Sequence, residues 1–178
     1  MTNIRAAQLE DSRAIAEVHV TAWRESYRDL VPETVLNNLS VSERTDKWRQ
    51  AIQKMSSNLA YHPIFVAERN GEIVGFADGG PCRSVSLGQE MEIYAIYLLA
   101  RAKRRGFGSA LLRTLAMDFV SKGALSAGVW VLRDNHTARS FYERFGAQCA
   151  ADRVERRPEC DLIEVGYIWS DLRPIISN

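Results

Sequence analysis

The sequence has few of the cysteines that would indicate a disulfide scaffold or a metal site. Its 178 residues include only Cys82, Cys149 and Cys160, an odd number without the short spacings of metal ligands. We therefore expect reduced thiols and no disulfide framework. The three histidines are scattered along the chain as well, so we expect no bound metal ion.

Long apolar runs and an excess of one charge are also missing. No segment approaches the roughly 20 apolar residues that a membrane-spanning helix needs, and the N-terminal residues do not resemble a signal peptide. We therefore expect a cytoplasmic protein that has no membrane partner. Lys and Arg (23) nearly balance Asp and Glu (22), for a net charge of +1. This balance argues against a protein that coats nucleic acid or anionic lipid.

What the sequence does have is the composition of an ordinary globular protein, with 46% apolar and 25% charged residues. A chain of this length can bury a sizeable core without disulfides or a structural metal. No internal repeat or low-complexity linker divides it. We therefore expect a single domain over residues 1–178.

The first half of the chain shows helical periodicity and then changes to β-type runs. We expect a strand at 4–7, a helix over 11–26, a short helix opened by Pro32 and a helix with Ser42 as its N-cap. Apolar runs at 64–67 and 73–77 flank Asn70-Gly71, a dipeptide that favours a tight hairpin. Gly79-Gly80-Pro81 is expected to end the second run.

The second half alternates strands and helices. Strands are expected at 91–98, 129–132, 147–154 and 162–169, and helices behind Gly108 and over 135–145. The resulting order predicts an α/β fold built on a mixed, mostly antiparallel sheet.

A basic loop containing two glycines lies between the expected strand 91–98 and the helix that follows it. The loop consists of Lys103, Arg104, Arg105, Gly106, Phe107, Gly108 and Ser109. Free N–H groups and the helix dipole at such a helix start favour an anion, and glycine lets phosphate oxygens approach the backbone. A solvated basic turn at the start of an ordinary helix is the alternative, because a short glycine pattern alone is common.

A second motif follows the strand at 129–132. Asn135 begins a predicted helix, and Ala138, Phe141, Tyr142 and Gly146 follow it. Asn135 and Tyr142 are seven residues apart, close to two helical turns, so their side chains lie on nearly the same face. The alternative interpretation, an apolar core stripe, suffices for Phe141 and for Phe145.

With these two motifs in this order, the sequence resembles the Gcn5-related N-acetyltransferase family. The resemblance implies a sheet flanked by helices on both faces, and acetyl-coenzyme A as cosubstrate. It implies that residues 103–109 bind the diphosphate, that Asn135 holds the pantetheine arm, and that backbone groups of Ile96, Tyr97 and Leu98 bind pantetheine. Lys103 departs from the Gln or Arg that is usual at its position.

The resemblance also suggests how the chemistry is divided between residues. Acetyl transfer to an amine by direct attack needs a base, because an alkylammonium has a pKa of about 10.4. Glu92 is the candidate base from its offset to Leu98, with Glu90 and Asp78 as competitors. Tyr142 is the candidate acid that protonates the departing CoA thiolate.

Several alternatives stay open. A catalytically silent acyl-CoA-binding sensor would share the glycine loop, whereas a nucleic-acid-binding domain is disfavoured by the charge balance. The three acidic residues near the expected site favour a small-molecule amine as acceptor over a protein amine. A homodimer is an expectation that rests on the family resemblance only.

Overall fold

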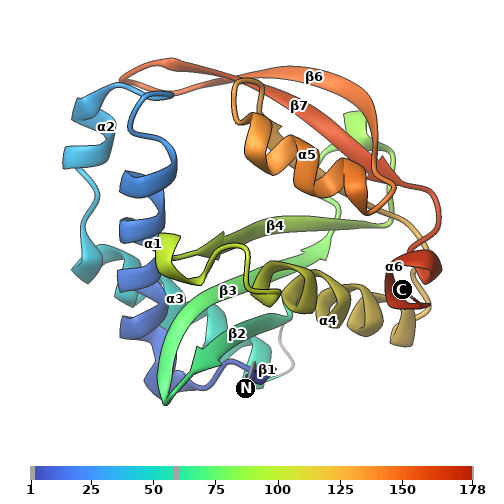
Figure 1. The fold of residues 1–178 in the computed structure, drawn as a ribbon, viewed down its shortest axis with the longest axis horizontal. Coiled ribbons are helices and arrows are strands. Elements are labelled where there is room, and N and C mark those ends of the chain that lie inside the picture. Colours follow the sequence, from blue (N-terminus) through green and yellow to red (C-terminus); the bar gives the residue numbers. More distant parts are fainter. Residues whose placement is uncertain (1–2, 58–60, 178) are drawn as a thin grey trace.

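The β-type runs of the sequence assemble into one seven-stranded sheet, in the order β1-β2-β3-β4-β5-β7-β6 (Figure 1). The structure is a computed structural model and describes residues 3–57 and 61–177. The strands are β1 (Asn3–Ala6), β2 (Ile64–Arg69), β3 (Glu72–Pro81), β4 (Met91–Leu98), β5 (Ala127–Leu132), β6 (Gln148–Arg156) and β7 (Asp161–Trp169). Neighbouring strands are antiparallel except β4 and β5, which are parallel. The expected mixed, mostly antiparallel sheet is confirmed.

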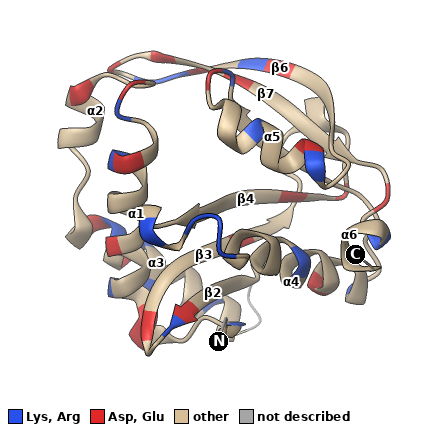
Figure 2. Cartoon of the chain, viewed as in Figure 1, with Lys and Arg blue, Asp and Glu red and all other residues tan. Residues whose placement is uncertain are grey.

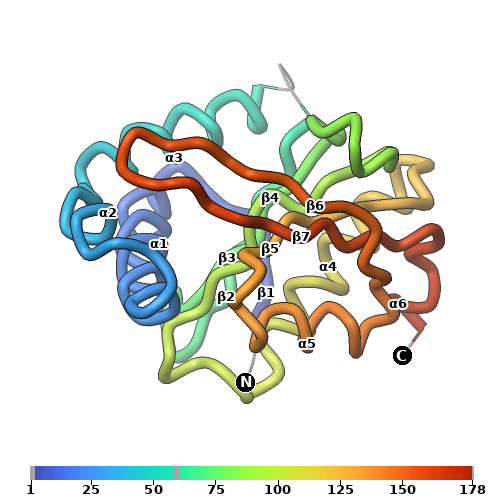
Figure 3. The backbone as a smooth tube through the Cα atoms, turned by 90° about the horizontal axis from the view of Figure 1, so that it is seen from above, coloured from blue at the N-terminus to red at the C-terminus, as the bar shows by residue number. Residues whose placement is uncertain are grey.

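Helices cover both faces of this sheet, as the family resemblance implied. The helices are α1 (Ser12–Ser26), α2 (Glu33–Asn37), α3 (Val41–Ser56), α4 (Phe107–Ser121), α5 (His136–Arg144) and α6 (Arg173–Ser177). Short 3₁₀ turns are η1 (Leu9–Asp11), η2 (Val85–Leu87) and η3 (Ala100–Ala102). Seen from above, the strands separate α1, α2 and α3 from α4, α5 and α6 (Figure 3). Of these helices, α6 was not predicted.

Two apolar layers hold the helices on the sheet. On one face Ile15 of α1 and Ile52 of α3 pack with Phe76 of β3, and all three are fully buried. On the other face Leu111 and Leu115 of α4 are equally buried in a cluster that includes Ile93 of β4. Each such side chain contributes about 1.5–3 kcal/mol by leaving water. The amphipathic stripes that predicted α1, α3 and α4 therefore also fix their positions.

The hairpin between β2 and β3 forms where the sequence placed it. Asn70 and Gly71 both have positive φ angles, 53° and 80°, which is the backbone geometry that made this dipeptide informative.

Three local expectations were wrong. The N-cap of α3 is Ser40, whose Oγ accepts the Glu43 N–H at 3.3 Å, so Ser42 lies inside the helix. Helix α4 begins at Phe107, before Gly108. Strand β3 continues through Gly79 and Gly80 to Pro81 because these glycines make room for neighbours: a Cβ on Gly79 would lie 2.8 Å from the Phe119 ring.

Candidate active site

The central feature of the site is the separation of strands β4 and β5. The two strands pair only from Met91 to Ile93 of β4 and from Ala127 to Val129 of β5. Beyond Ile93, β4 continues to pair with β3 alone, and β5 pairs with β7. Over 96–98, the β4 edge on the side of β5 therefore has no strand partner among the described residues, and its backbone N–H and C=O groups are suited to an amide-containing ligand. We call this separation of β4 and β5 the opening. Ile96, Tyr97 and Leu98 lie on this edge, and their contact with pantetheine stays a prediction.

The chain then enters the basic loop, which turns sharply before α4 begins. Arg104 and Gly106 both have positive φ, 58° and 86°, and Gly106 is the residue that precedes the helix. No side chain of the described residues caps the first turn of α4, and no acidic residue lies in it. The free N–H groups and the positive end of the helix dipole are therefore available to an anion.

The side chains of this loop have different partners. Lys103 donates through Nζ to Ser26 Oγ at 2.9 Å, and Arg105 donates to the Arg101 carbonyl at 3.1 Å. Figure 2 shows the loop as a basic stretch in front of α4. Gly108 is a packing position, because a Cβ there would come within 3.3 Å of Leu98 Cδ1. Phe107 is buried in the core, so its contribution to a ligand site is limited to its backbone.

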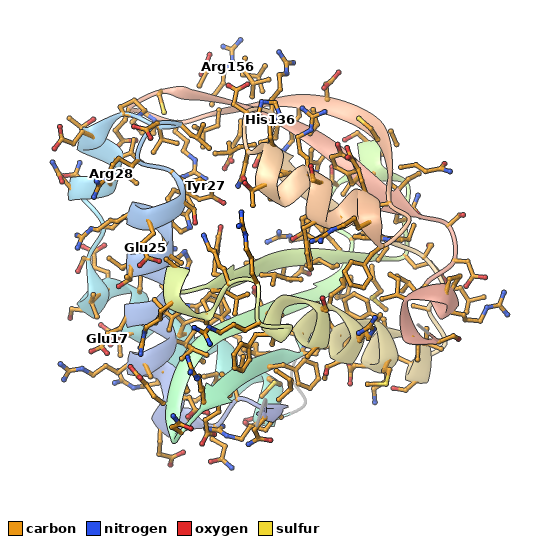
Figure 4. The ribbon with its side chains drawn as sticks, viewed as in Figure 1. Glu17, Glu25, Tyr27, Arg28, His136 and Arg156 are labelled. Carbon is orange, nitrogen blue, oxygen red and sulfur yellow. The ribbon has the colours of Figure 1, made fainter. Side chains whose placement is uncertain are left out.

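Across the opening stands α5, the helix that carries Asn135 and Tyr142. Asn135 caps α5 by accepting the Ala138 N–H through Oδ1 at 3.1 Å, which gives this side chain a structural role that the sequence motif did not reveal. A cleft of about 270 Å³ lies beside it, lined by Glu25, Ser26 and 28–30 and by 134–137. Figure 4 shows Glu25 and Tyr27 at the end of α1 and His136 at the start of α5, on either side of this region.

Tyr142 projects from α5 into a group of aromatic side chains. Its ring is only 6% exposed and packs edge-on against Trp169, with 5.8 Å between centroids. Burial raises the pKa of Tyr142, and the nearby Tyr27 raises it further. Burial likewise raises the pKa of Tyr97, with Tyr27 and Tyr142 adding to the effect. The pKa of Tyr27 is raised by burial too, so these three neighbouring phenols keep their protons.

The three candidate bases differ in what holds each carboxylate. Glu92 is 3% exposed; its Oε1 accepts Arg83 Nη2 at 2.7 Å and its Oε2 accepts the Arg83 backbone N–H at 3.0 Å. Glu90 accepts the backbone N–H groups of Leu125 and Ser126, which lower its pKa and bind it to the segment before β5. Glu90 is thus occupied by main-chain donors at an exposed position.

Asp78 is the third carboxylate and is 5% exposed. Its Oδ2 lies 3.0 Å from His62 Nε2, whereas its buried Oδ1 has no hydrogen-bond partner among the described residues. Burial raises the pKa of Asp78, and His62 opposes the rise. No sequence pattern indicates the His62–Asp78 pair, because its members are 16 residues apart and belong to no motif.

The structure adds two negative findings. Within residues 3–57 and 61–177, no three His, Cys, Asp or Glu side chains gather as a metal site. None of the helices that the structure describes has the length and apolar character of a membrane span.

Comparison with known proteins identifies the family. Residues 14–147 match the acetyltransferase (GNAT) family. The chain belongs to this family. It is 38% identical over 173 residues to the protein called Uncharacterized N-acetyltransferase YuaI of Bacillus subtilis, and the aligned residues make up 97% of this chain and 95% of that protein. As a GNAT member with such relatives, the chain is an acyltransferase.

Solved GNAT structures share the fold at lower identity. The PaiA N-acetyltransferase of Thermoplasma acidophilum, in complex with coenzyme A, has a TM-score of 0.71 at 22% identity and covers 93% of this chain and 98% of its own. YncA of Salmonella typhimurium, with acetyl-CoA, has a TM-score of 0.70 at 17% identity, and the match covers 97% of this chain and 94% of that chain. The GNAT fold that the sequence predicted is confirmed.

Proposed function

We propose that this GNAT protein transfers the acetyl group of acetyl-CoA to the primary amine of a small molecule, by direct attack of the amine on the thioester. The observation that carries the proposal is the separation of β4 and β5 beyond Ile93, with the glycine loop following β4 and the buried Tyr142 near enough to Tyr97 of β4 to affect its pKa. The relative YuaI is named an N-acetyltransferase, and the neighbours PaiA and YncA hold coenzyme A and acetyl-CoA.

The residues of the opening fit the parts of this cosubstrate. In our proposal the uncapped first turn of α4 and the loop 103–109 bind the diphosphate, because they offer free N–H groups and positive charge. The β4 edge at Ile96, Tyr97 and Leu98 binds the amides of the pantetheine arm. Asn135 contributes from the start of α5 with its remaining amide N–H groups, since its Oδ1 caps the helix.

Tyr142 is the proposed acid. Since burial raises its pKa, the phenol stays protonated at neutral pH and can give its proton to the CoA thiolate that departs beside it. No covalent intermediate with the enzyme is needed, because the amine itself is the nucleophile.

Two buried carboxylates can serve as the base. The offset from Leu98 makes Glu92 one candidate, and if Glu92 were the base, Glu92→Gln would lower turnover most at low pH. Its carboxylate must first release a bond to Arg83, whose side chain is 62% exposed and so able to move. Asp78 already has one oxygen, Oδ1, without a hydrogen-bond partner among the described residues. Both carboxylates support a cationic amine as the acceptor, because their negative charge attracts an ammonium group.

The test is to measure free thiol release from acetyl-CoA with a panel of amines, and to identify the product by mass spectrometry. Acetyl-CoA-dependent thiol release with a small amine, and a product heavier by one acetyl group, is the expected result. Titration calorimetry with CoA is the control, because it measures binding separately from thiol release. Binding without thiol release would instead indicate a silent acyl-CoA-binding module, and no binding at all would refute the proposal.

A further inference from the structure

A cluster of polar side chains lies on the face of β3 and β4 opposite α4. Asp78 follows Phe76 by two residues and so shares its face, the one that α1 and α3 cover. Tyr94 reaches over Gly80, where a Cβ would come within 2.8 Å of its hydroxyl, and packs edge-on to His62 at 5.3 Å between centroids. The Arg83 guanidinium also belongs to this cluster and stacks on the Tyr94 ring, 3.6 Å from the ring centroid.

The free oxygen of Asp78 is the unusual feature of this cluster. Buried carboxylate oxygens are normally hydrogen-bonded, and one without a partner costs about 1–3 kcal/mol or more. The described residues provide a partner for Oδ2, which is His62, and none for Oδ1. A buried acceptor of this kind calls for a donor that the chain does not supply, and a substrate N–H group would serve.

Asp78 also lies close to the point where β4 and β5 separate. It pairs across the sheet with Ala95, two residues beyond Ile93, the last β4 residue that pairs with β5. Asp78 therefore flanks the segment of β4 along which the two strands separate. Glu92, in contrast, lies within the paired segment, and both of its oxygens are occupied by Arg83.

We propose that Asp78, rather than Glu92, is the base that takes the proton of the acceptor ammonium, and that His62 is a positioning residue that holds its carboxylate. The assignment rests on the proposed acetyl transfer. An N–H bond of the ammonium breaks and an O–H bond forms at Oδ1. The freed nitrogen lone pair attacks the thioester carbon, and the nitrogen loses its second proton to water as the amide forms. The C–S bond breaks, and the sulfur takes the Tyr142 proton. Asp78 then loses its proton to water, and Tyr142 regains one from water.

The charges around Asp78 suit this role. Burial raises its pKa and Glu92 raises it further, whereas His62 and Arg83 lower it. Tyr94 is the other titratable group of the cluster, and burial raises its pKa, so it stays neutral. Burial thus makes Asp78 a stronger proton acceptor than an exposed carboxylate, while His62 and Arg83 help to keep it ionised.

The decisive comparison is between Asp78→Asn and Glu92→Gln in the full chain. We expect Asp78→Asn to lower kcat/KM for the amine by about 10²–10⁴-fold, the usual contribution of a general base, with the Kd for CoA unchanged. Glu92→Gln should keep kcat/KM within about tenfold of the wild-type value, because it removes a charge near Asp78 but leaves the Asp78 carboxylate in place. Asp46→Asn, which breaks an exposed ion pair on α3, is the matched control and should match the wild type.

The results separate the base assignment from the function itself. If the wild type is active and kcat/KM of Asp78→Asn stays within about tenfold of the wild-type value, Asp78 is not the base. The same follows if Asp78→Asn loses no more kcat/KM than Glu92→Gln. In both cases acetyl transfer itself stands. A wild type that releases no thiol with any amine refutes the proposed function and this assignment with it. Unchanged CoA affinity in calorimetry shows that the variants are folded.

His62 is tested by a shift in pH that a merely structural role would not produce. His62→Phe keeps a ring against Tyr94 and removes the hydrogen bond that lowers the pKa of Asp78. The acidic limb of kcat/KM against pH should therefore move to higher pH, and His62→Gln, which retains an N–H donor, should move it less. A limb that stays in place in His62→Phe would refute the positioning role.

Discussion

At the scale of single residues, burial decides what Tyr142 can do. A phenol on the surface would lose its proton near pH 10, but burial raises the pKa of Tyr142, and so it remains a proton donor throughout the physiological range. The same burial excludes water from the ring, which packs on Trp169.

We expect Tyr142→Phe to slow thiol release by about 10²-fold at neutral pH, since the CoA sulfur then departs without a proton. The defect should shrink above about pH 8.5, where a thiolate is the stable form in water. Stopped-flow detection of free thiol measures both effects. Tyr167→Phe is the control: it removes a part-buried hydrogen bond donated by Arg139 and another donated to Glu143, and should alter stability without altering this rate. Equal thiol release by Tyr142→Phe and the wild type would exclude the acid role.

The residues of the site differ in how far the sequence could reveal them. Tyr142 and the loop around Gly106 belong to motifs with fixed spacing, so they could be found by counting. His62 and Arg83 could not, because each gains its importance from a partner brought close by strand register: Asp78 in one case, Glu92 in the other. A pair that forms across a sheet leaves no local pattern.

At the scale of elements, the start of α4 depends on backbone geometry more than on side chains. Gly106 has φ of 86° and an open space where a Cβ would be, so replacing it strains the backbone without causing a clash. The same is true of Gly71 in the β2–β3 hairpin, with φ of 80°. The two glycines therefore form a matched pair of positions.

We expect Gly106→Ala and Gly71→Ala each to lower the free energy of unfolding by about 1–2 kcal/mol, the cost of a left-handed residue with a Cβ. Only Gly106→Ala should also weaken CoA binding, by about tenfold, because only this turn presents the first N–H groups of α4 to the diphosphate. Urea unfolding and calorimetry give the two quantities. If Gly71→Ala weakened CoA binding equally, the loop would have no special part in it.

The start of α3 offers a second test at this scale. Ser40→Ala removes the side chain that accepts the Glu43 N–H and should cost about 1 kcal/mol of unfolding free energy. Ser42→Ala, inside the helix, should cost less or even stabilise, since alanine is the better helix former. Thermal or urea unfolding of both variants distinguishes them, and a larger loss for Ser42→Ala would contradict the observed cap.

These elements show where sequence patterns are sufficient and where they are not. Strand β4 was predicted with its exact bounds because its apolar run is bordered by polar residues and a basic loop. Strand β3 was predicted too short because glycines commonly end strands, whereas Gly79 and Gly80 serve close packing with α4 and Tyr94. The spacing Ser40-x-x-Glu43 is typical of a helix start and indicates the true N-cap of α3, but Ser42 was a second candidate N-cap two residues later.

At the scale of the whole molecule, the separation of the parallel strands β4 and β5 is the feature on which the proposed acetyl-CoA site depends. The two strands share three pairs, after which β4 stays paired with β3 and β5 stays paired with β7. Periodicity could not predict this separation, since it reports which face a residue occupies and not where two strands part. The single domain and the homodimer stay predictions.

The aromatic layer between α1, α3 and the sheet gives the whole fold a dependence on pH. His19 is 8% exposed among Trp23, Trp48, Phe76 and Tyr97, and burial lowers its pKa to about 3. In the unfolded chain the pKa of histidine is about 6.5, so between these values the unfolded state binds the extra proton. Stability is therefore full above pH 6.5 and falls as the pH drops below it.

The loss from this one side chain should reach about 2 kcal/mol between pH 8 and pH 5, at about 1.4 kcal/mol per pH unit below the unfolded pKa. Urea unfolding across this range measures it. His19→Phe keeps an aromatic ring in the layer and should flatten the pH dependence by that amount, whereas His136→Gln, at an exposed position, should leave the dependence intact. An unchanged slope in His19→Phe would mean that His19 is not buried in its neutral form, and that α1 does not seal this face of the sheet.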